Sequence, residues 1–295
     1  MRSPLTTVAA IHDLSGFGRT SLAVAIPVLS NMGVQVYSLP TAVLSSETGA
    51  FDDFVFVDLT HAMAGFLDHW DRLGAKFDAV YSGFLGSPAQ VELVARCIEN
   101  NLLPEGFSVV DPVLGDNGQL DATMSMDMVE RMRWLVTRAT CITPNLTEAA
   151  LLLGEEYPAG EMPVGKLMEW LARLGDMGPE KVIITSAPLG KNARKTSVAA
   201  YDKERDMYWK VACDYIPAFY PGTGDTFASV VTGSLLQGDS LPVAVERAVQ
   251  FVTLGIRATF GHDLPTRNGI LLERVLHTLN LPMTASTYTL LQEEE

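Results

Sequence analysis

Short apolar runs alternate with amphipathic segments along the chain, and this pattern limits the possible folds more than any other feature of the sequence. Val8–Ile11, Val34–Leu39 and Ala79–Ser82 predict strands, because each is a short apolar run followed by polar or turn residues. Residues 20–30 and 60–73 predict helices between them. Strands that alternate with helices indicate an α/β layered fold with a mostly parallel sheet. Ligands bind outside the carboxyl ends of the strands in such sheets, so we expect the site in the residues that follow each strand.

The later segments continue this alternation and then become helical. Residues 197–201 and 207–211, with a polar turn between them, predict a hairpin. The remaining expected strands are 109–111, 141–143 and 181–185, and the remaining expected helices begin near 88 and span 124–136, 146–153, 167–174, 226–236, 242–259 and 268–279. Apart from the acidic end of the chain, residues 1–295 contain no internal repeat, long linker or low-complexity tract, so we expect a single domain.

The chain is strongly acidic, with 21 Lys and Arg against 35 Asp and Glu and a net charge of −14. Such a chain repels phosphate backbones and anionic lipid heads, so neither nucleic acid nor a membrane is an expected partner. Residues 20–46 carry no charge, but Pro27 and Pro40 interrupt them, so they predict a buried helix and strand rather than a membrane span. The three cysteines are few and widely spaced, which favours a reducing compartment, and with no visible secretory signal we expect a cytoplasmic protein.

The strongest chemical signal is Gly222-Thr223-Gly224-Asp225, which opens an apolar helix. Glycines let backbone amides point inward without a β-carbon in the way, and a helix N terminus adds about half a positive charge. Such a turn can bind a transferring phosphoryl group or a developing oxyanion, and an aspartate held there can accept a proton from a hydroxyl. The alternative is a helix-capping aspartate after a glycine turn, and so short a motif leaves both interpretations open.

Two further polar clusters follow expected strands. Asn145 and Glu148 lie three residues apart at a helix start, so they share a face and suit a hydrated magnesium ion with its phosphates. Ordinary capping, with Asn145 as the cap and Glu148 as its partner, explains the same spacing. Asp111 ends an apolar strand beside a proline, which is an unusual place for a structural carboxylate. Asp116 begins a tight turn, and turn chemistry alone explains it.

The loop after the first strand contains Gly16 and Gly18, whose spacing resembles a dinucleotide-binding fingerprint. The third glycine of that fingerprint is missing, because Ser21 occupies its position. A dehydrogenase is therefore not favoured, although the α/β pattern alone would allow one. A pocket for a small ligand, lined by Asp13 and Ser15, fits this loop better.

Taken together, these clusters resemble the ribokinase-like superfamily of small-molecule kinases. In that group G-x-G-D supplies the anion hole and the base, and N-x-x-E holds magnesium; both motifs match here, at 222–225 and 145–148. Within the superfamily the chain is similar to pyridoxal/pyridoxamine kinases, the vitamin B6 salvage enzymes, over about residues 8–270. The other segments that carry this likeness are SSETG at 45–49, SGFLG at 82–86, DPVLGD at 111–116, TPN at 143–145 and TS at 185–186.

The resemblance implies a ribokinase-like three-layer αβα fold with a central, mostly parallel sheet flanked by helices, and a homodimer. It implies an enzyme that phosphorylates the 5′-hydroxymethyl group of a B6 vitamer with ATP and Mg²⁺. Asp225 would be the base, and the amides of Gly222, Thr223 and Gly224 would form the anion hole. The residues implied to organise Mg-ATP are Asp111, Asp116, Asn145, Glu148, Thr185 and Ser186, with Asp111 and Glu148 on the metal. Those implied to contact the pyridine ring are His12, Asp13, Thr48 and Phe84.

Three positions depart from the pattern of pyridoxal kinases, and all three lie on the substrate side. Ile11 stands where a serine is common, Glu47 where a histidine is common and Phe84 where a tyrosine is common. They keep open a kinase of another primary alcohol, such as hydroxymethylpyrimidine or a sugar. A different class of function would be a non-catalytic protein that binds a B6 vitamer or a nucleotide, and the intact Asp225 and glycine turn argue against it. The basic loop 187–195 predicts either a segment that closes over ATP or a solvated connection within a hairpin.

Overall fold

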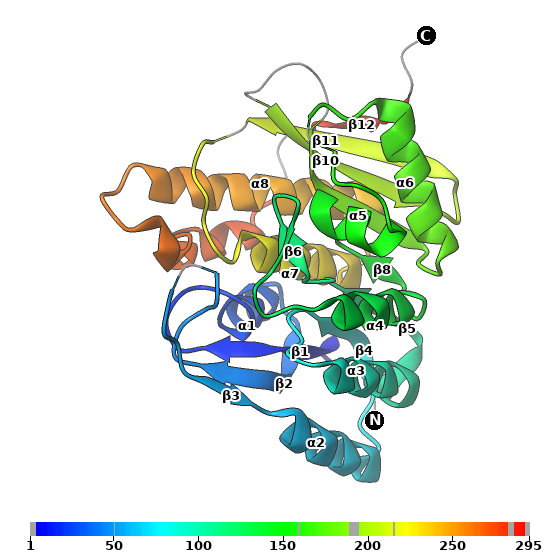
Figure 1. Cartoon of the computed structure of the whole chain (residues 1–295), viewed down its shortest axis with the longest axis vertical. Helices are drawn as coiled ribbons and strands as arrows, with labels where there is room; N and C mark the ends of the chain where they lie inside the picture. Colours follow the sequence, from blue (N-terminus) through cyan, green and yellow to red (C-terminus); the bar gives the residue numbers. More distant parts are fainter. Residues whose placement is uncertain are drawn as a thin grey trace.

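The computed structural model describes residues 4–49, 51–158, 160–188, 195–214, 216–282 and 286–292. A ten-stranded sheet runs through these residues (Figure 1). Its strands are β1 (Thr7–Ser15), β2 (Gln35–Leu44), β3 (Phe56–Asp58), β4 (Phe77–Ser82), β5 (Leu102–Val110), β8 (Cys141–Ile142), β9 (Lys181–Ala187), β10 (Lys195–Asp202), β11 (Met207–Asp214) and β12 (Tyr288–Leu290). Their order in space is β12-β11-β10-β9-β8-β5-β4-β1-β2-β3. A separate two-stranded hairpin consists of β6 (Gly115–Asp116) and β7 (Gln119–Leu120).

The middle of the sheet is parallel and its two edges are antiparallel. The strands from β2 through β1, β4, β5 and β8 to β9 pair in parallel. β3 pairs antiparallel with β2, and β10, β11 and β12 extend the other edge in antiparallel pairs. The mostly parallel sheet and the hairpin expected from the sequence are therefore confirmed. β1 is buried at every residue except Leu14, which is the continuous burial that a central parallel strand requires.

Helices cover both faces of the sheet and complete three layers (Figure 1). One face packs against α1 (Leu22–Asn31), α7 (Thr223–Leu236) and α8 (Leu241–Phe260). The other face packs against α2 (Thr60–Leu73), α3 (Pro88–Asn101), α4 (Met126–Val136), α5 (Leu146–Leu153) and α6 (Val164–Asp176). Each face has its own hydrophobic cluster, centred on fully buried side chains such as Leu29 on the first and Leu135 on the second. Burying one such leucine contributes about 1.5–3 kcal/mol, so both clusters stabilise the layered arrangement.

The end of the chain differs from the sequence-based expectation. In place of one helix over 268–279, the structure has a 3₁₀ turn at Thr266–Asn268, a short helix α9 (Leu272–Val275) and a second 3₁₀ turn at Leu276–Asn280. Gly269 separates them because its backbone has φ 74° and ψ −177°, which no helix accommodates. A β-carbon at Gly269 would also lie 3.1 Å from Arg19 Cβ and 3.2 Å from the Pro221 carbonyl oxygen. The glycine thus lets the chain pass close to the start of α7.

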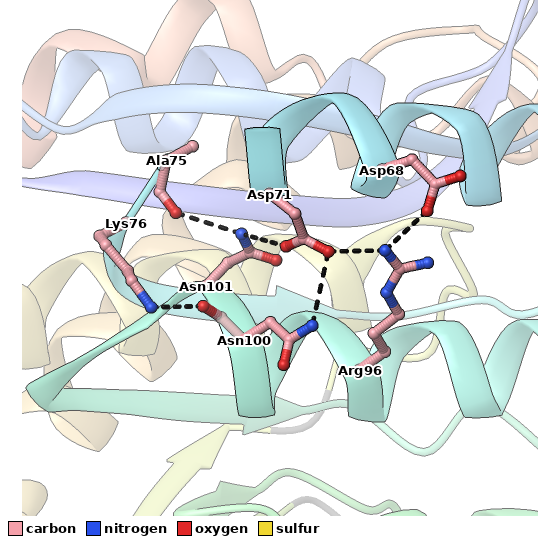
Figure 2. Close-up of polar contacts among 7 residues, drawn as sticks. All are labelled: Asp68, Asp71, Ala75, Lys76, Arg96, Asn100 and Asn101. Atoms are coloured by element: carbon pink, nitrogen blue, oxygen red, sulfur yellow. Dashed lines mark hydrogen bonds and ion pairs between the residues drawn. The ribbon is translucent and has the colours of Figure 1, made fainter. Parts of the chain in front are cut away.

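A polar network joins the C-terminal halves of α2 and α3 (Figure 2). Arg96 Nη2 contacts Asp68 Oδ1 at 2.7 Å and Asp71 Oδ2 at 2.6 Å. The guanidinium of Arg96 lowers the pKa of Asp71 below its ordinary value. Asn101 is buried and donates from Nδ2 to Asp71 Oδ1 at 3.2 Å and to the Ala75 carbonyl at 3.1 Å. These contacts fix the two helices against each other.

A transmembrane segment is not found among the helices of the described residues, since none is both long enough and apolar enough to cross a bilayer.

Candidate active site

A cavity of about 740 Å³ lies at the carboxyl ends of the parallel strands. Residues that follow β1, β2, β4, β5, β8 and β9 line it together with the start of α7, which is where α/β sheets bind their ligands. The predicted site residues in its wall are Asp13, Thr48, Phe84, Asp111, Asp116, Asn145, Glu148, Thr185, Ser186, Gly222, Thr223, Gly224 and Asp225. Segments that are more than 200 residues apart in the sequence therefore meet at one cavity.

His12 is the predicted site residue that does not line this cavity. It is fully buried, and its ring packs edge-on against Tyr81 with the ring centroids 4.3 Å apart. A β-carbon at Gly83 would lie 2.3 Å from His12 Nδ1, so His12 packs against the backbone that carries Phe84. Burial lowers the pKa of His12 to about 3 and keeps the imidazole neutral. His12 therefore contacts the segment that carries Phe84, and its expected contact with the pyridine ring remains a prediction.

The pairing of β1 with β2 explains the difference between His12 and its neighbour. Helices cover both faces of β1. A side chain of this strand is therefore buried whichever face it points to, as His12 is. The register with β2 shifts between His12 and Leu14, so Asp13 lies at an irregularity of the ladder. Such bulges redirect a side chain at the end of a strand, and Asp13 lines the cavity.

The glycine turn 222–225 forms a tight entry into α7. Gly222 is the N-cap residue with φ 80°, and a β-carbon there would lie 1.8 Å from the Arg19 carbonyl oxygen. Glycine is therefore required at this position by both backbone conformation and close packing. Gly224 has open space where a side chain would project. No side chain of the described residues caps this end of α7, so its first amides are free to meet an anion.

Asp225 lies in the first turn of α7 and lines the cavity. Its pKa is raised to about 6, chiefly by burial and also by the negative charges of Asp13 and Glu47, against the lowering effect of a hydrogen bond from the Ser21 amide. The carboxylate is therefore mostly ionised at neutral pH, and its pKa is close enough to 7 for proton transfer. Asp225 can accept a proton from a hydroxyl group bound beside it.

Asp111 and Glu148 form a buried pair of acidic side chains. Thr143 Oγ1 donates to Asp111 Oδ1 at 2.9 Å. Burial raises the pKa of Asp111 to about 7, and the charge of Asp225 contributes to this shift. Burial and the charge of Asp111 raise the pKa of Glu148. Buried carboxylates of this kind need a nearby positive charge to remain ionised.

Asn145 and Glu148 form the capping box that the sequence allowed as an alternative. Asn145 Oδ1 accepts from the Glu148 amide at 2.9 Å, and Glu148 Oε2 accepts from the Asn145 amide at 2.8 Å. Glu148 Oε1 also accepts from the Leu114 amide at 3.1 Å, and Asn145 Nδ2 donates to the Gly115 carbonyl at 2.8 Å. The pair therefore holds the loop after β5 against the start of α5.

This acidic pair fits a magnesium ion with few protein ligands. Mg²⁺ binds through one or two carboxylates together with phosphate and water oxygens. Asp111 and Glu148 offer two buried carboxylates, and ionised carboxylate oxygens that accept one hydrogen bond keep further lone pairs. Among the described residues, no three His, Cys, Asp or Glu side chains are arranged to hold a metal by themselves. An ion here would thus depend on phosphate oxygens for the rest of its coordination.

Thr185 and Ser186 lie near the end of β9, beyond its ladder pairing with β8. Thr185 bridges to Asn145, and its amide donates to the Pro144 carbonyl at 2.9 Å. Ser186 has a positive φ of 58°, which turns the backbone at the end of the parallel region. In the basic loop 187–195, residues 189–194 lie outside the described residues, so the two interpretations of this loop remain predictions.

The wall of the cavity is acidic on both sides. Its acidic side chains are Asp13, Glu47, Asp111, Asp116, Asp121, Glu148 and Asp225. Within the part of the chain that the structure describes, the lining includes no Lys, Arg or His. A polyanionic nucleotide would therefore enter this cavity together with cations, because like charges repel strongly in a partly buried site.

Sequence reasoning missed several residues that line the cavity. Tyr157 lies in a loop without a recognisable motif, and it packs against Gly118, whose β-carbon would lie 2.8 Å from the Tyr157 ring. Cys213 and Phe219 belong to the edge hairpin and to the segment before α7, for which spacing in the sequence offered no signal. Ser21 was visible only as the residue in place of a third glycine, and the structure gives it a glycine-like φ of 51°.

Comparison with known proteins agrees with this architecture. Residues 25–268 match the family model described as phosphomethylpyrimidine kinase. A Bacteroides thetaiotaomicron protein described as a phosphomethylpyrimidine kinase, in a crystal form with pyridoxal, superposes with a TM-score of 0.94. It is 53% identical and the match covers 97% of this chain and 99% of that chain.

Two further relatives carry different activities in their names. The pyridoxal kinase of Lactobacillus plantarum superposes with a TM-score of 0.84 and is 33% identical over 94% of this chain and 97% of that chain. A hydroxymethylpyrimidine/phosphomethylpyrimidine kinase of Streptomyces coelicolor is 30% identical over 87% of this chain and 90% of that protein. The relatives thus agree on fold and on phosphoryl transfer, and they differ in the alcohol that receives the phosphoryl group.

Proposed function

We propose that this chain, which belongs to the phosphomethylpyrimidine kinase family within the ribokinase-like superfamily, phosphorylates the 5′-hydroxymethyl group of a B6 vitamer with ATP. The observation that carries the proposal is the meeting of two sites in one cavity. Asp225 and the glycine turn line this cavity together with Asp111, Asn145 and Glu148. Phosphoryl transfer depends mainly on positioning and charge neutralisation, so it needs a base, an anion hole and a metal-nucleotide site together.

In this mechanism Asp225 accepts the proton of the substrate hydroxyl as its oxygen attacks the γ-phosphorus of ATP. The bond from the γ-phosphorus to the bridging oxygen breaks, and ADP leaves with that electron pair. The amides of Gly222, Thr223 and Gly224 stabilise the negative charge on the transferring group. Asp225 then releases its proton to solvent, so one phosphate ester, one ADP and one proton form for each ATP consumed.

The other predicted residues position the two substrates. When bound, Mg²⁺ neutralises the phosphate charge, and Asp111 and Glu148 would hold it. We assign Asp116, Asn145, Thr185 and Ser186 to the nucleotide phosphates. We assign Asp13, Thr48 and Phe84 to the pyridine ring, with His12 supporting the backbone beneath Phe84.

Hydroxymethylpyrimidine is the second candidate substrate. The family match and the Streptomyces coelicolor relative favour it, because both are described by pyrimidine kinase activity. The pyridoxal in the Bacteroides thetaiotaomicron crystal form supports the B6 vitamer instead. Both candidates are primary alcohols on a six-membered heteroaromatic ring, so they use the same phosphoryl-transfer residues and differ in their contacts with Glu47 and Phe84.

We further propose that residues 1–295 act as one kinase domain, in the cytoplasm, as a homodimer. The sheet edge formed by β3 supports the homodimer, because Val55, Phe56 and Val57 expose 63%, 38% and 50% of their surface there. An exposed apolar edge strand is a surface that another chain commonly covers, and a second copy is the occupant we propose. Sedimentation velocity should give a dimer for the protein and a monomer for Val57→Lys.

The decisive experiment measures ADP release with Mg-ATP and a panel of alcohols. The panel contains pyridoxal, pyridoxine, pyridoxamine, hydroxymethylpyrimidine and ribose, and mass spectrometry identifies each phosphorylated product. We expect vitamer-dependent ADP release with a vitamer 5′-phosphate as product. Release with hydroxymethylpyrimidine alone would move the substrate to the second candidate, and folded protein that binds a vitamer without ADP release would indicate a binding protein.

A further inference from the structure

Tyr81 is a fully buried side chain that contacts the wall of the cavity from behind without lining it. It belongs to β4, which pairs in parallel with β1 on one side and with β5 on the other. The ladder places Tyr81 opposite Ala10 and Val109, so its backbone is held in the middle of the sheet. A buried tyrosine needs a partner for its hydroxyl group, and Tyr81 has two partners on one helix.

The hydroxyl group of Tyr81 joins the sheet to the first turns of α7. Tyr81 Oη donates to the carbonyl oxygen of Asp225 at 3.4 Å, and Ser229 Oγ donates to Tyr81 Oη at 3.4 Å. Ser229 is also fully buried, and it lies one helical turn after Asp225. Burial and the negative charges of Asp111 and Asp225 raise the pKa of Tyr81, so the hydroxyl group keeps its proton and remains a donor. A chain of hydrogen bonds therefore runs from Ser229 through Tyr81 to the backbone of Asp225.

The ring of Tyr81 is held in place by His12. The two ring centroids are 4.3 Å apart and the ring planes are inclined by 71°, which is the edge-to-face arrangement that aromatic pairs favour. His12 in turn packs against Gly83, where a β-carbon would lie 2.3 Å from His12 Nδ1. Strand pairing and the neighbouring ring thus fix the position of the Tyr81 hydroxyl group.

The start of α7 needs such a support because its own sequence constrains it weakly. Its N-cap residue is Gly222, which has no side chain to cap the helix, and Gly224 follows two residues later. Glycine loses more conformational freedom on folding than any other residue, so a turn with two glycines must be ordered by its surroundings. Thr226 Oγ1 donates to the Gly222 carbonyl at 2.7 Å and orders the turn from within the helix. Tyr81 orders it from the sheet, at the residue that carries the proposed base.

We propose that Tyr81 is a positioning residue, which holds the first turn of α7 against β4 and so fixes Asp225 and the amides of residues 222–224 relative to the strand ends. This inference rests on the proposed kinase function, because that function assigns the base to Asp225. Phosphoryl transfer depends on the alignment of base, hydroxyl group and anion hole, so a small displacement of this turn lowers the rate more than it weakens binding. Tyr81 itself touches neither the alcohol nor the nucleotide in this assignment, because it does not line the cavity.

The test uses Tyr81→Phe, which keeps the ring against His12 and removes only the hydroxyl group. We expect kcat to fall by about 3–10-fold, as the loss of one hydrogen bond predicts, while KM for ATP and KM for the alcohol stay within about twofold. The melting temperature should also fall, because Ser229 Oγ is left buried without its acceptor. A residue that only stabilised the fold would lower the melting temperature and leave kcat unchanged at temperatures well below it.

Tyr201→Phe is the matched control. Tyr201 is also a buried tyrosine of the sheet, on β10, and its hydroxyl group donates to Asp206 Oδ1 at 3.2 Å. It does not line the cavity, so its replacement should lower the melting temperature and leave kcat and both KM values unchanged. An unchanged kcat in Tyr81→Phe, or an equal fall in Tyr201→Phe, would overturn the proposal. If Tyr81→Phe does not fold, Ser229→Ala takes its place, because it removes the other hydrogen bond between Tyr81 and α7, and an unchanged kcat would then count against the proposal in the same way.

Amide hydrogen exchange separates this inference from the kinase proposal, because it needs no turnover. Exchange of the amides of residues 223–229, measured by mass spectrometry on the intact protein, should be faster in Tyr81→Phe, while that of α4 stays unchanged. Equal exchange in the two proteins would overturn the positioning role even where activity is present. Failure of every alcohol in the panel would overturn the kinase function, and the exchange measurement would still decide whether Tyr81 holds the start of α7.

Discussion

The starts of α5 and α7 use the same local pattern for different purposes. Each helix has an acidic residue three positions after its N-cap, Glu148 after Asn145 and Asp225 after Gly222. In α5 Glu148 completes a capping box, because its carboxylate accepts a hydrogen bond from the backbone amide of the N-cap residue Asn145. In α7 no side chain caps the start of the helix within the described residues, and the Asp225 carboxylate lines the cavity instead of completing a cap.

The N-cap residue determines which of the two arrangements forms. Asn145 has a side chain that caps α5, so Glu148 and Asn145 satisfy each other's backbone amides. Gly222 has none, and no asparagine could replace it, because its β-carbon would lie 1.8 Å from the Arg19 carbonyl oxygen. The acid of α5 therefore serves the fold as well as the proposed metal site, whereas the acid of α7 takes no part in a cap and keeps its carboxylate for chemistry.

The largest effect that this comparison predicts is loss of activity in Asp225→Asn. Asparagine keeps the shape of the side chain but cannot accept the hydroxyl proton, so kcat should fall by about 10²–10⁴-fold. ATP binding, measured by calorimetry with Mg²⁺ present, should remain close to that of the unchanged protein. The assay is ADP release with the best alcohol of the panel.

Asp127→Asn is the matched control for this change. Asp127 also lies in the first turn of a helix, α4, and it does not line the cavity. Its replacement should leave kcat unchanged. Near-normal turnover by folded Asp225→Asn would remove Asp225 from the mechanism and would make the starts of α5 and α7 functionally alike.

A smaller effect is expected on the stability of Glu148→Ala, which also loses a proposed Mg²⁺ ligand and should therefore turn over more slowly. The change removes the acceptor of the Asn145 and Leu114 amides, and buried amides left without a partner destabilise the fold by about 2–3 kcal/mol in total. Urea denaturation followed by circular dichroism measures this difference. Glu130→Ala is the control, since Glu130 is exposed and forms a surface ion pair with Arg133.

Sequence patterns predicted the fold well where short-range signals decide it. The helix 146–153 has the bounds expected from its cap, its leucines and Gly154, which takes a left-handed conformation with φ 70°. Prediction failed where distant contacts decide. Ser87 and Gln90 have the three-residue spacing of a capping box, which predicts that Gln90 bonds to Ser87. The Gln90 side chain instead accepts from the Gly86 amide and donates to the Thr41 carbonyl. The predicted helix 268–279 is broken because Gly269 must fit against Arg19 and Pro221.

In the candidate site, too, features set by short-range signals could be predicted and features set by distant contacts could not. Positions at strand ends could be predicted because parallel strands bring their carboxyl ends together, and Asp13, Asp111 and Thr185 all line the cavity. The burial of His12 could not, because it depends on helices that cover β1 from both sides. The place of Ser21 in the lining could not either, because it goes with a positive backbone φ that no pattern in the sequence predicts.

The smallest predicted effect is a pH-dependent gain in stability for Asp225→Asn. The folded pKa of Asp225 is about 6 against an ordinary value of 3.8, so the folded state holds this proton more tightly than the unfolded state. The aspartate therefore destabilises the fold progressively as the pH rises from about 4 to 6, and the full effect is present above pH 6. Asparagine removes it, so the variant should be more stable by about 1–2 kcal/mol at pH 7.5. Urea denaturation of both proteins at pH 7.5 and pH 4 measures the difference, which should vanish at the lower pH because Asp225 is then protonated in the folded state and close to its pKa in the unfolded state. A gain of equal size at both pH values would show that Asp225 is not held above its ordinary pKa.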